Sequence, residues 1–139
     1  MDSLHQSLPL LQGTCANGIY IVHSEPASWT QALQHYRHDF YHLPDYAALC
    51  ARSERSRACA FEVRFENARF FMPMLIRHVP SVLRFDGEDV YTPYGYSGPL
   101  VEADSPQARA DVVYEGLACL RDVLHRLGMV SVFISWHRL

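Results

Sequence analysis

The strongest constraint on the fold lies between Ala58 and Arg77, where apolar and polar side chains alternate. Alternation with a period of two is typical of a β-strand with one buried face. Residues 70–76 are apolar on both faces, which predicts a second strand deeper in the sheet or under a helix. Pro73 within it has no N–H to donate, so the sequence predicts a bulge or an unpaired side there. In the first strand the apolar residues of one face are Cys59, Phe61, Val63 and Phe65. They alternate with Ala60, Glu62, Arg64 and Glu66.

A second pattern, from Ser105 to Leu127, predicts a long amphipathic helix. Ser105 and Pro106 are residue types favoured at the N-cap and at the first helical position, and Gly128 is favoured just beyond the last turn. Between them, apolar residues recur at alternating spacings of three and four, which places them on one face. These residues are Ala110, Val113, Leu117, Leu120, Leu124 and Leu127. We expect four of them to pack on the sheet: Val113, Leu117, Leu120 and Leu124.

The remaining segments complete an order of strand, two helices, two strands, a loop, a helix and a strand. This order, in a chain of 139 residues, predicts an α/β (α+β) fold: a mixed, mostly antiparallel sheet with packed helices. We expect one domain at residues 19–139, after a loose lead-in at residues 1–18. The other expected elements are strands at Ile19–His23 and Met129–Trp136, a helix from Trp29 capped by Ser28, and a helix from Pro44.

Composition excludes several classes of function. The net charge is −3 and all 12 basic residues are arginines, so the chain lacks a basic footprint for DNA and has no lysine nucleophile. No stretch approaches the roughly 20 apolar residues of a membrane span. The start, Met1–Leu11, lacks the basic region of a signal peptide. We therefore expect a cytoplasmic protein with no membrane span and no direct DNA binding.

The four cysteines form no Cys-x-x-Cys pair, which argues against a zinc ribbon or a thioredoxin-like motif. Cys59 and Cys119 lie in apolar patterns and are interpreted as small buried hydrophobes. For a cytoplasmic chain the default expectation is that all four thiols are reduced.

A histidine-rich segment raises the question of a metal site. If the segment is helical, His35, His38, Asp39 and His42 share one face. Ligands on successive turns of one straight helix point along a line and do not converge on a tetrahedron. We therefore predict no zinc site and favour a polar, partly buried helix end. Pro44 predicts that this helix stops before it.

The most unusual stretch runs from Asp86 to Leu100 and holds three tyrosines, three glycines and two prolines. The prolines exclude a regular helix, and rigid aromatic loops often carry binding residues. Tyr94 and Tyr96 fall on one side if the loop is extended. A structural turn held by buried tyrosines is the alternative. The stretch matches no phosphate-binding motif. Its three carboxylates are interpreted as a solvated acidic turn, with a general base as the alternative: Asp86, Glu88 and Asp89.

Three runs together resemble a known family. They are His38–Tyr46, the hairpin that ends in Pro73–Arg77 and, above all, Tyr91–Pro99, which reads Tyr-Thr-Pro-Tyr-Gly-Tyr-Ser-Gly-Pro. They resemble the FemAB-like branch of the GNAT acyltransferases, which includes peptidoglycan bridge-forming aminoacyltransferases. The resemblance covers residues 19–132 and corresponds to the N-terminal one of the two GNAT-like halves found in that family.

The resemblance implies the acceptor-side half of an acyl- or aminoacyltransferase, with N-acyl transfer to an amine on a small molecule, a peptide or a cell-wall precursor. A complete two-half relative would use acyl-CoA or aminoacyl-tRNA as donor. This chain has no Arg/Gln-x-x-Gly-x-Gly/Ala donor loop, so we expect no cofactor for it alone. No catalytic residue is assigned. The residues implied in acceptor binding are Tyr91, Tyr94, Gly95, Tyr96, Gly98, Asp39 and Tyr41.

Two alternatives stay open from the sequence. The chain is also compatible with a non-catalytic binding module, or a truncated gene product, that binds a peptide, a sugar or a partner domain. A lone half would expose the surface that its second half covers, so we expect a homodimer or a second GNAT half along Met129–Trp136, with Trp136 near the contact.

Overall fold

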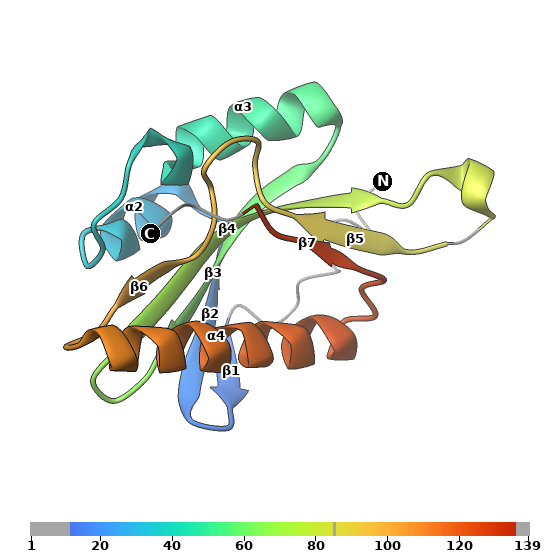
Figure 1. The fold of residues 1–139 in the computed structure, drawn as a ribbon. Helices are drawn as coiled ribbons and strands as arrows, with labels where there is room; N and C mark the ends of the chain where they lie inside the picture. The colour runs from blue at the N-terminus through green and yellow to red at the C-terminus, as the bar shows by residue number, and fades with distance from the viewer. Residues whose placement is uncertain (1–11, 85, 136–139) are drawn as a thin grey trace.

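A computed structural model describes residues 12–84 and 86–135 of the chain. In these residues a seven-stranded sheet lies between two helical layers (Figure 1). Helices α2 and α3 cover one face and helix α4 covers the other. The helices are α2 (Pro26–Leu33), α3 (Pro44–Glu54) and α4 (Pro106–Arg126), with short 3-10 helices η1 (Phe40–His42) and η2 (Ser81–Leu83).

The strand order is β1-β2-β3-β4-β5-β7, and β6 pairs with β4. Neighbouring strands are antiparallel except β5 and β7, which are parallel. The predicted α+β class with a mixed, mostly antiparallel sheet is therefore confirmed. The strands are β1 (Gln12–Cys15), β2 (Gly18–His23), β3 (Arg57–Arg64), β4 (Arg69–His78), β5 (Glu88–Tyr91), β6 (Leu100–Glu102) and β7 (Val132–Phe133).

The predicted hairpin at Ala58–Arg77 is confirmed as β3 and β4, which pair without interruption from Arg57–Ile76 to Arg64–Arg69. Their side chains alternate between two cores, one under α4 and one under α2 and α3. Ala60 and Glu62 are buried because α2 and α3 cover their face. The prediction of a half-buried β3 is wrong for that reason.

Pro73 lies opposite Ala60 in this register, so the strand contains no bulge there. On the other edge of β4, β6 pairs with Arg69–Phe71 and β5 pairs with Leu75–His78. Pro73 falls in the interval between these two partners. The missing N–H is tolerated because the described chain places no strand beside that interval.

Helix α4 begins and ends as predicted. The Ser105 side chain accepts a hydrogen bond from the Ala108 N–H at 3.1 Å, and Gly128 has φ 76°. The predicted burial of Leu120 and Leu124 is confirmed. In the N-terminal half of α4 the buried stripe is rotated from the predicted one, because the Phe70 ring occupies the space where a Cβ of Gly116 would lie. Val113 and Leu117 are consequently only half-buried. The buried residues are Val112, Gly116, Cys119, Leu120, Val123 and Leu124.

The two ends of the described chain differ from prediction. Residues 12–23 form the β1–β2 hairpin, so the loose lead-in is wrong for residues 12–18, and residues 1–11 lie outside the described chain. Helix α2 starts at Pro26, not Trp29, with Glu25 as N-cap. At the other end, β7 has two residues instead of the predicted strand to Trp136, which itself lies outside the described residues.

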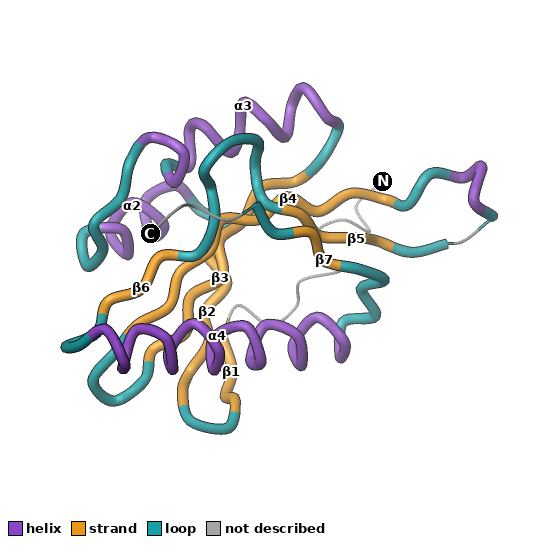
Figure 2. Tube along the Cα trace, viewed as in Figure 1, coloured by secondary structure: helices purple, strands orange, loops and turns teal. Residues whose placement is uncertain are grey.

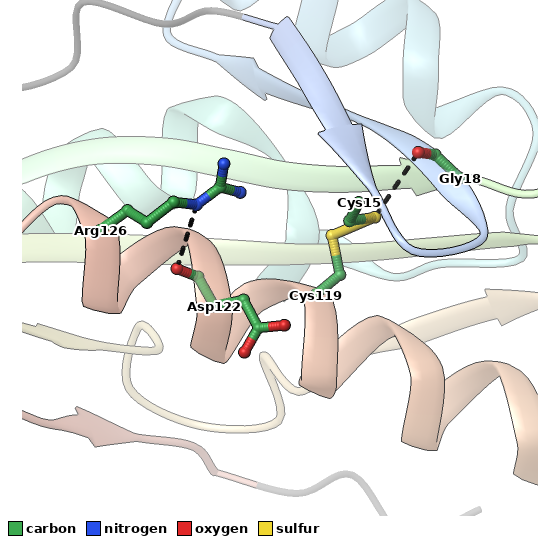
Figure 3. Close-up of a disulfide and its surroundings, with 5 residues drawn as sticks. All are labelled: Cys15, Gly18, Cys119, Asp122 and Arg126. Atoms are coloured by element: carbon green, nitrogen blue, oxygen red, sulfur yellow. Dashed lines mark hydrogen bonds between the residues drawn. A yellow bond between two sulfur atoms is a disulfide. The ribbon is translucent and has the colours of Figure 1, made fainter.

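A disulfide joins Cys15 on β1 to Cys119 on α4, across 104 residues of sequence (Figure 3). The expectation that all four cysteines are reduced is therefore wrong for this pair. Cys59 keeps a free thiol in the core, as predicted, and burial raises its pKa to about 12. No helix in the described part of the chain has the length and apolar character needed to cross a membrane.

Leu120→Ala should lower the free energy of unfolding by ~2–5 kcal/mol, because Leu120 is fully enclosed between α4 and the sheet. Tyr114→Ala, at a strongly exposed position of the same helix, is the matched control and should change stability by less than about 0.5 kcal/mol. Chemical denaturation measures both. Equal losses for the two variants would contradict the observed orientation of α4.

Candidate functional site

Two loops from distant parts of the sequence meet beside helix α3. One is residues 34–43, which connect α2 to α3 through η1, and the other is residues 92–99, which connect β5 to β6 (Figures 1 and 2). Because β5 and β6 pair with the same edge of β4, both ends of the second loop are fixed on the sheet. The predicted loop at 86–100 is therefore shorter than expected, with strands at each end.

Four aromatic rings from these loops and from α3 pack together, and a fifth aromatic residue is tied to them through its backbone. We call the five residues the aromatic platform: Phe40, Tyr41, Tyr46, Tyr96 and the backbone-linked Tyr94. The ring of Tyr41 packs edge-to-face with Tyr46 at 5.3 Å and with Tyr96 at 5.7 Å, measured between centroids. Phe40 stacks on Tyr41 at 4.1 Å. Such pairs are favourable beyond their buried area. Tyr94 joins through its backbone, whose carbonyl oxygen accepts a hydrogen bond from the Tyr46 hydroxyl at 2.7 Å.

The platform is open to solvent. Tyr94 is 80% exposed, and Phe40 and Tyr96 are each 55% exposed. Exposed aromatic groups gathered in one place mark interaction sites more often than scattered apolar residues do. The alternative of a turn held by buried tyrosines does not describe Tyr94 and Tyr96.

Close packing of the loops depends on Gly95. Its φ is 92°, in the region that favours glycine, and the Tyr41 ring occupies the space where a Cβ would lie. The chain turns at residues 94–96, so the extended alternation expected for Tyr94 and Tyr96 does not apply. The glycine is required here both by backbone conformation and by the neighbouring ring.

His42 links the two loops beneath the platform and is only 1% exposed. Its Nε2 lies 3.1 Å from the Gly98 carbonyl oxygen, and its Nδ1 lies 3.1 Å from Asp39 Oδ1. Burial lowers the pKa of His42, although the Gly98 carbonyl and Asp39 act in the opposite direction. The neutral ring carries one N–H, which serves either acceptor. The indole N–H of buried Trp29 donates to the His42 carbonyl at 2.8 Å and fixes the same segment.

The Tyr46 hydroxyl stays a hydrogen-bond donor over a wide pH range. Burial, and then the neighbouring Cys50, raise the pKa of Tyr46 to about 12. The link between Tyr46 and the Tyr94 carbonyl is therefore maintained at neutral and mildly basic pH.

The structure brings most of the sequence-predicted site residues together. Within or directly beneath the platform lie Asp39, Tyr41, Tyr94, Gly95, Tyr96 and Gly98. Tyr91 lies outside it, on β5, where its hydroxyl contacts Ser56 Oγ and the Arg77 guanidinium lies 4.7 Å from its ring centroid. Sequence reasoning missed Phe40, Tyr46 and the linking role of His42. The sequence feature that could have indicated them is the high number of aromatic residues on both sides of Pro44.

The histidine-rich segment is not helical. Helix α2 ends at Leu33, and His35, His38 and His42 lie in the connection and in η1. Within residues 12–84 and 86–135, no group of three His, Cys, Asp or Glu side chains is arranged to hold a metal ion.

The prediction of a solvated acidic turn is wrong for Glu88 and Asp89, because both lie on β5 and are paired with arginines. Glu88 contacts Arg57 at 3.2 Å, and Asp89 contacts Arg77 at 2.9 Å. Asp86 lines a shallow hollow of about 360 Å³ next to Gly128. Glu88 and Asp89 lie at the start of β5, whereas the loop of residues 92–99 follows the other end of that strand.

A second polar cluster lies in the core beneath α2. The fully buried carboxylate of Glu62 accepts hydrogen bonds from the Tyr36 hydroxyl at 2.8 Å and from Arg64 at 3.2 Å, and His23 Nε2 lies 3.1 Å away. Burial alone would raise the pKa of Glu62, but these partners lower it below its usual value. The cluster ties β2, β3 and the end of α2 together, and it explains how Glu62 occupies a face predicted to be solvated.

Comparison of the chain with family models, curated proteins and solved structures finds no significant match to any of them. The resemblance to FemAB-like GNAT proteins therefore rests on the three runs quoted above. Two of those runs supply all five residues of the platform.

Gly95→Ala should destabilise the protein more than Gly128→Ala. At Gly128, φ is 76° and no atom lies within 4 Å of the added methyl group, so only backbone strain of about 1–2 kcal/mol is expected. At Gly95 the same strain is joined by displacement of the Tyr41 ring. Chemical denaturation gives the two losses, and near-ultraviolet circular dichroism reports the tyrosine packing. An equal loss, with unchanged tyrosine signals, would contradict the packing of the two loops.

Proposed function

We propose that this chain is the acceptor-binding half of an acyl- or aminoacyltransferase and that the aromatic platform is its acceptor site. One observation carries the proposal. The runs His38–Tyr46 and Tyr91–Pro99, on which the family resemblance rests, meet in a single exposed site, and Tyr46 is hydrogen-bonded to Tyr94 across 48 residues of sequence.

The chemistry of the platform supports an amine-bearing acceptor. Aromatic faces attract ammonium groups, and tyrosine hydroxyls add polar contacts at the edge of such a site. The platform itself carries no basic side chain that would repel a cation. A peptide or cell-wall precursor with a free amino group fits these properties.

The platform supplies no evident general base. His42 is enclosed beneath it, and its ring nitrogens are occupied by Asp39 and Gly98. We propose that deprotonation of the acceptor and binding of the donor, an acyl-CoA or aminoacyl-tRNA, belong to a complete two-half enzyme. Such donors place the proposed activity in the cytoplasm, which cell fractionation tests.

The second candidate is a non-catalytic module that binds a peptide, a sugar or a partner domain. The high exposure of Tyr94 and Phe40 favours it, because residues this accessible suit a docking surface as well as a cleft. Isothermal titration with a short peptide bearing a free amino group, and with its N-acetylated form, separates the two candidates for this chain, since only an acceptor site requires the free amine.

We also propose self-association, or contact with a second half, along β7. Val132 and Phe133 are exposed on this short strand, which is paired only with β5 in the described chain, and the exposed Val130 lies just before it. Light scattering should give a dimer mass that falls to the monomer mass in Phe133→Ser. A monomer at high concentration in the unsubstituted protein would contradict this contact.

Tyr94→Ala and Tyr96→Ala should leave the melting temperature nearly unchanged, because both side chains are exposed, but should weaken acceptor binding. Contacts between an ammonium group and an exposed aromatic face are typically worth about 0.5–1 kcal/mol, so we expect a roughly two- to fivefold rise in Kd. The measurement is a titration followed by nuclear magnetic resonance, with a short peptide bearing a free amino group and with its N-acetylated form.

Tyr114→Ala, an exposed tyrosine on α4 away from the platform, is the control and should bind as the unsubstituted protein does. Equal binding of the free and acetylated peptides would count against an amine acceptor while leaving a binding platform intact. Unfolding of both platform variants would instead make the tyrosines supports of the fold, and the site would have to be abandoned.

A further inference from the structure

Strand β1 makes few contacts with the rest of the protein. It is the edge of the seven-stranded sheet, its pairing partner in the described chain is β2 alone, and none of its four residues is buried. A segment with few buried contacts opens at a low free energy. The position of β1 therefore depends on what ties it to another layer of the fold.

The tie is the disulfide from Cys15, the last residue of β1, to Cys119 in the middle of α4 (Figure 3). Cys119 is buried in the core, whereas Cys15 is only half-buried, beside the turn into β2. Its Sγ lies 3.7 Å from the Gly18 carbonyl oxygen. The accessible sulfur is thus the one on the edge strand, where an external thiolate can reach it.

Strand β2 has the properties of an edge that needs a cover. Its residues Gly18–Val22 read Gly-Ile-Tyr-Ile-Val, with no charge and no proline. Natural edge strands avoid pairing with other chains by carrying charges or prolines or by being covered. In this fold the cover is β1, which pairs with Gly18–Ile21 residue by residue.

We propose that the Cys15–Cys119 disulfide is a redox-sensitive link that keeps β1 over the edge of β2, and that its reduction uncovers this edge as a pairing surface for a second copy of the chain. The second copy is the occupant because the uncovered run is uncharged and pairs antiparallel with itself without like charges facing each other. The inference is independent of the proposed acyl transfer.

The chemistry is a thiol–disulfide exchange. A dithiol reductant of the thioredoxin class attacks Cys15 Sγ, the Sγ–Sγ bond breaks, and Cys119 leaves as a thiolate that takes up a proton. The second thiol of the reductant then releases Cys15, so two electrons and two protons pass to the protein and the reductant becomes a disulfide. In a cytoplasmic protein, which is the location proposed above, a disulfide is usually transient and catalytic or redox-sensing.

Size-exclusion chromatography with light scattering, with and without dithiothreitol, tests the proposal. All proteins in this test carry Phe133→Ser, which removes the proposed β7 contact. In this background we expect the mass to double, from one to two chains of 15.9 kDa, when the disulfide is reduced. Adding Cys15→Ser with Cys119→Ser should give the dimer without reductant. Adding Cys50→Ser, which removes a free thiol elsewhere, should leave the response to reductant unchanged.

A third change identifies the surface. Ile19 is 45% exposed, so Ile19→Lys in the double-serine background should fold, and the charge on the β2 edge should restore the monomer. The β7 contact does not contribute to these masses, because every variant in the test carries Phe133→Ser. The proposal is overturned if the reduced protein stays monomeric with β1 amides protected from hydrogen exchange, if Ile19→Lys leaves the dimer intact, or if reduction abolishes the far-ultraviolet circular dichroism of the fold.

Discussion

The pairing of β3 with β4 is the interaction on which the rest of the structure depends. Each of these strands is buried on both faces, so side chains on one side form the core with α4 and side chains on the other form the core with α2 and α3. β4 also accepts β5 and β6 along its second edge. The loop that carries Tyr94 and Tyr96 therefore starts and ends on strands that are paired with the buried strand β4, which places exposed aromatic rings on a rigid support.

Local patterns predicted the elements that local chemistry controls. The hairpin at β3 and β4 followed from alternation, and both ends of α4 followed from Ser105, Pro106 and Gly128. The face that α4 buries did not follow, because it is decided by contact between Gly116 and Phe70, which lie far apart in sequence. The disulfide was missed for the same reason, since spacing alone cannot reveal a bond across 104 residues.

The candidate site shows the same division. Tyr94, Gly95 and Tyr96 were expected from the composition of their loop, and Tyr41 and Asp39 from the family resemblance. Their contact with Phe40 and Tyr46 depends on how α3 is oriented, and periodicity carries no information on that orientation. Glu62 is the reverse case, because a charged residue in an alternating strand indicates solvent unless the helices that cover it are known.

The interval at Pro73 has a consequence for how this fold can vary. Strands β5 and β6 pair with β4 on either side of this interval. The loop of residues 92–99 that joins them can therefore gain or lose residues without shifting any pair between β3 and β4. Tolerance to insertion is thus concentrated in the loop that bears two of the platform tyrosines. Proteins built on this sheet can therefore differ in the length of the loop at residues 92–99, and so in the surface it presents, while the core around β3 and β4 stays the same.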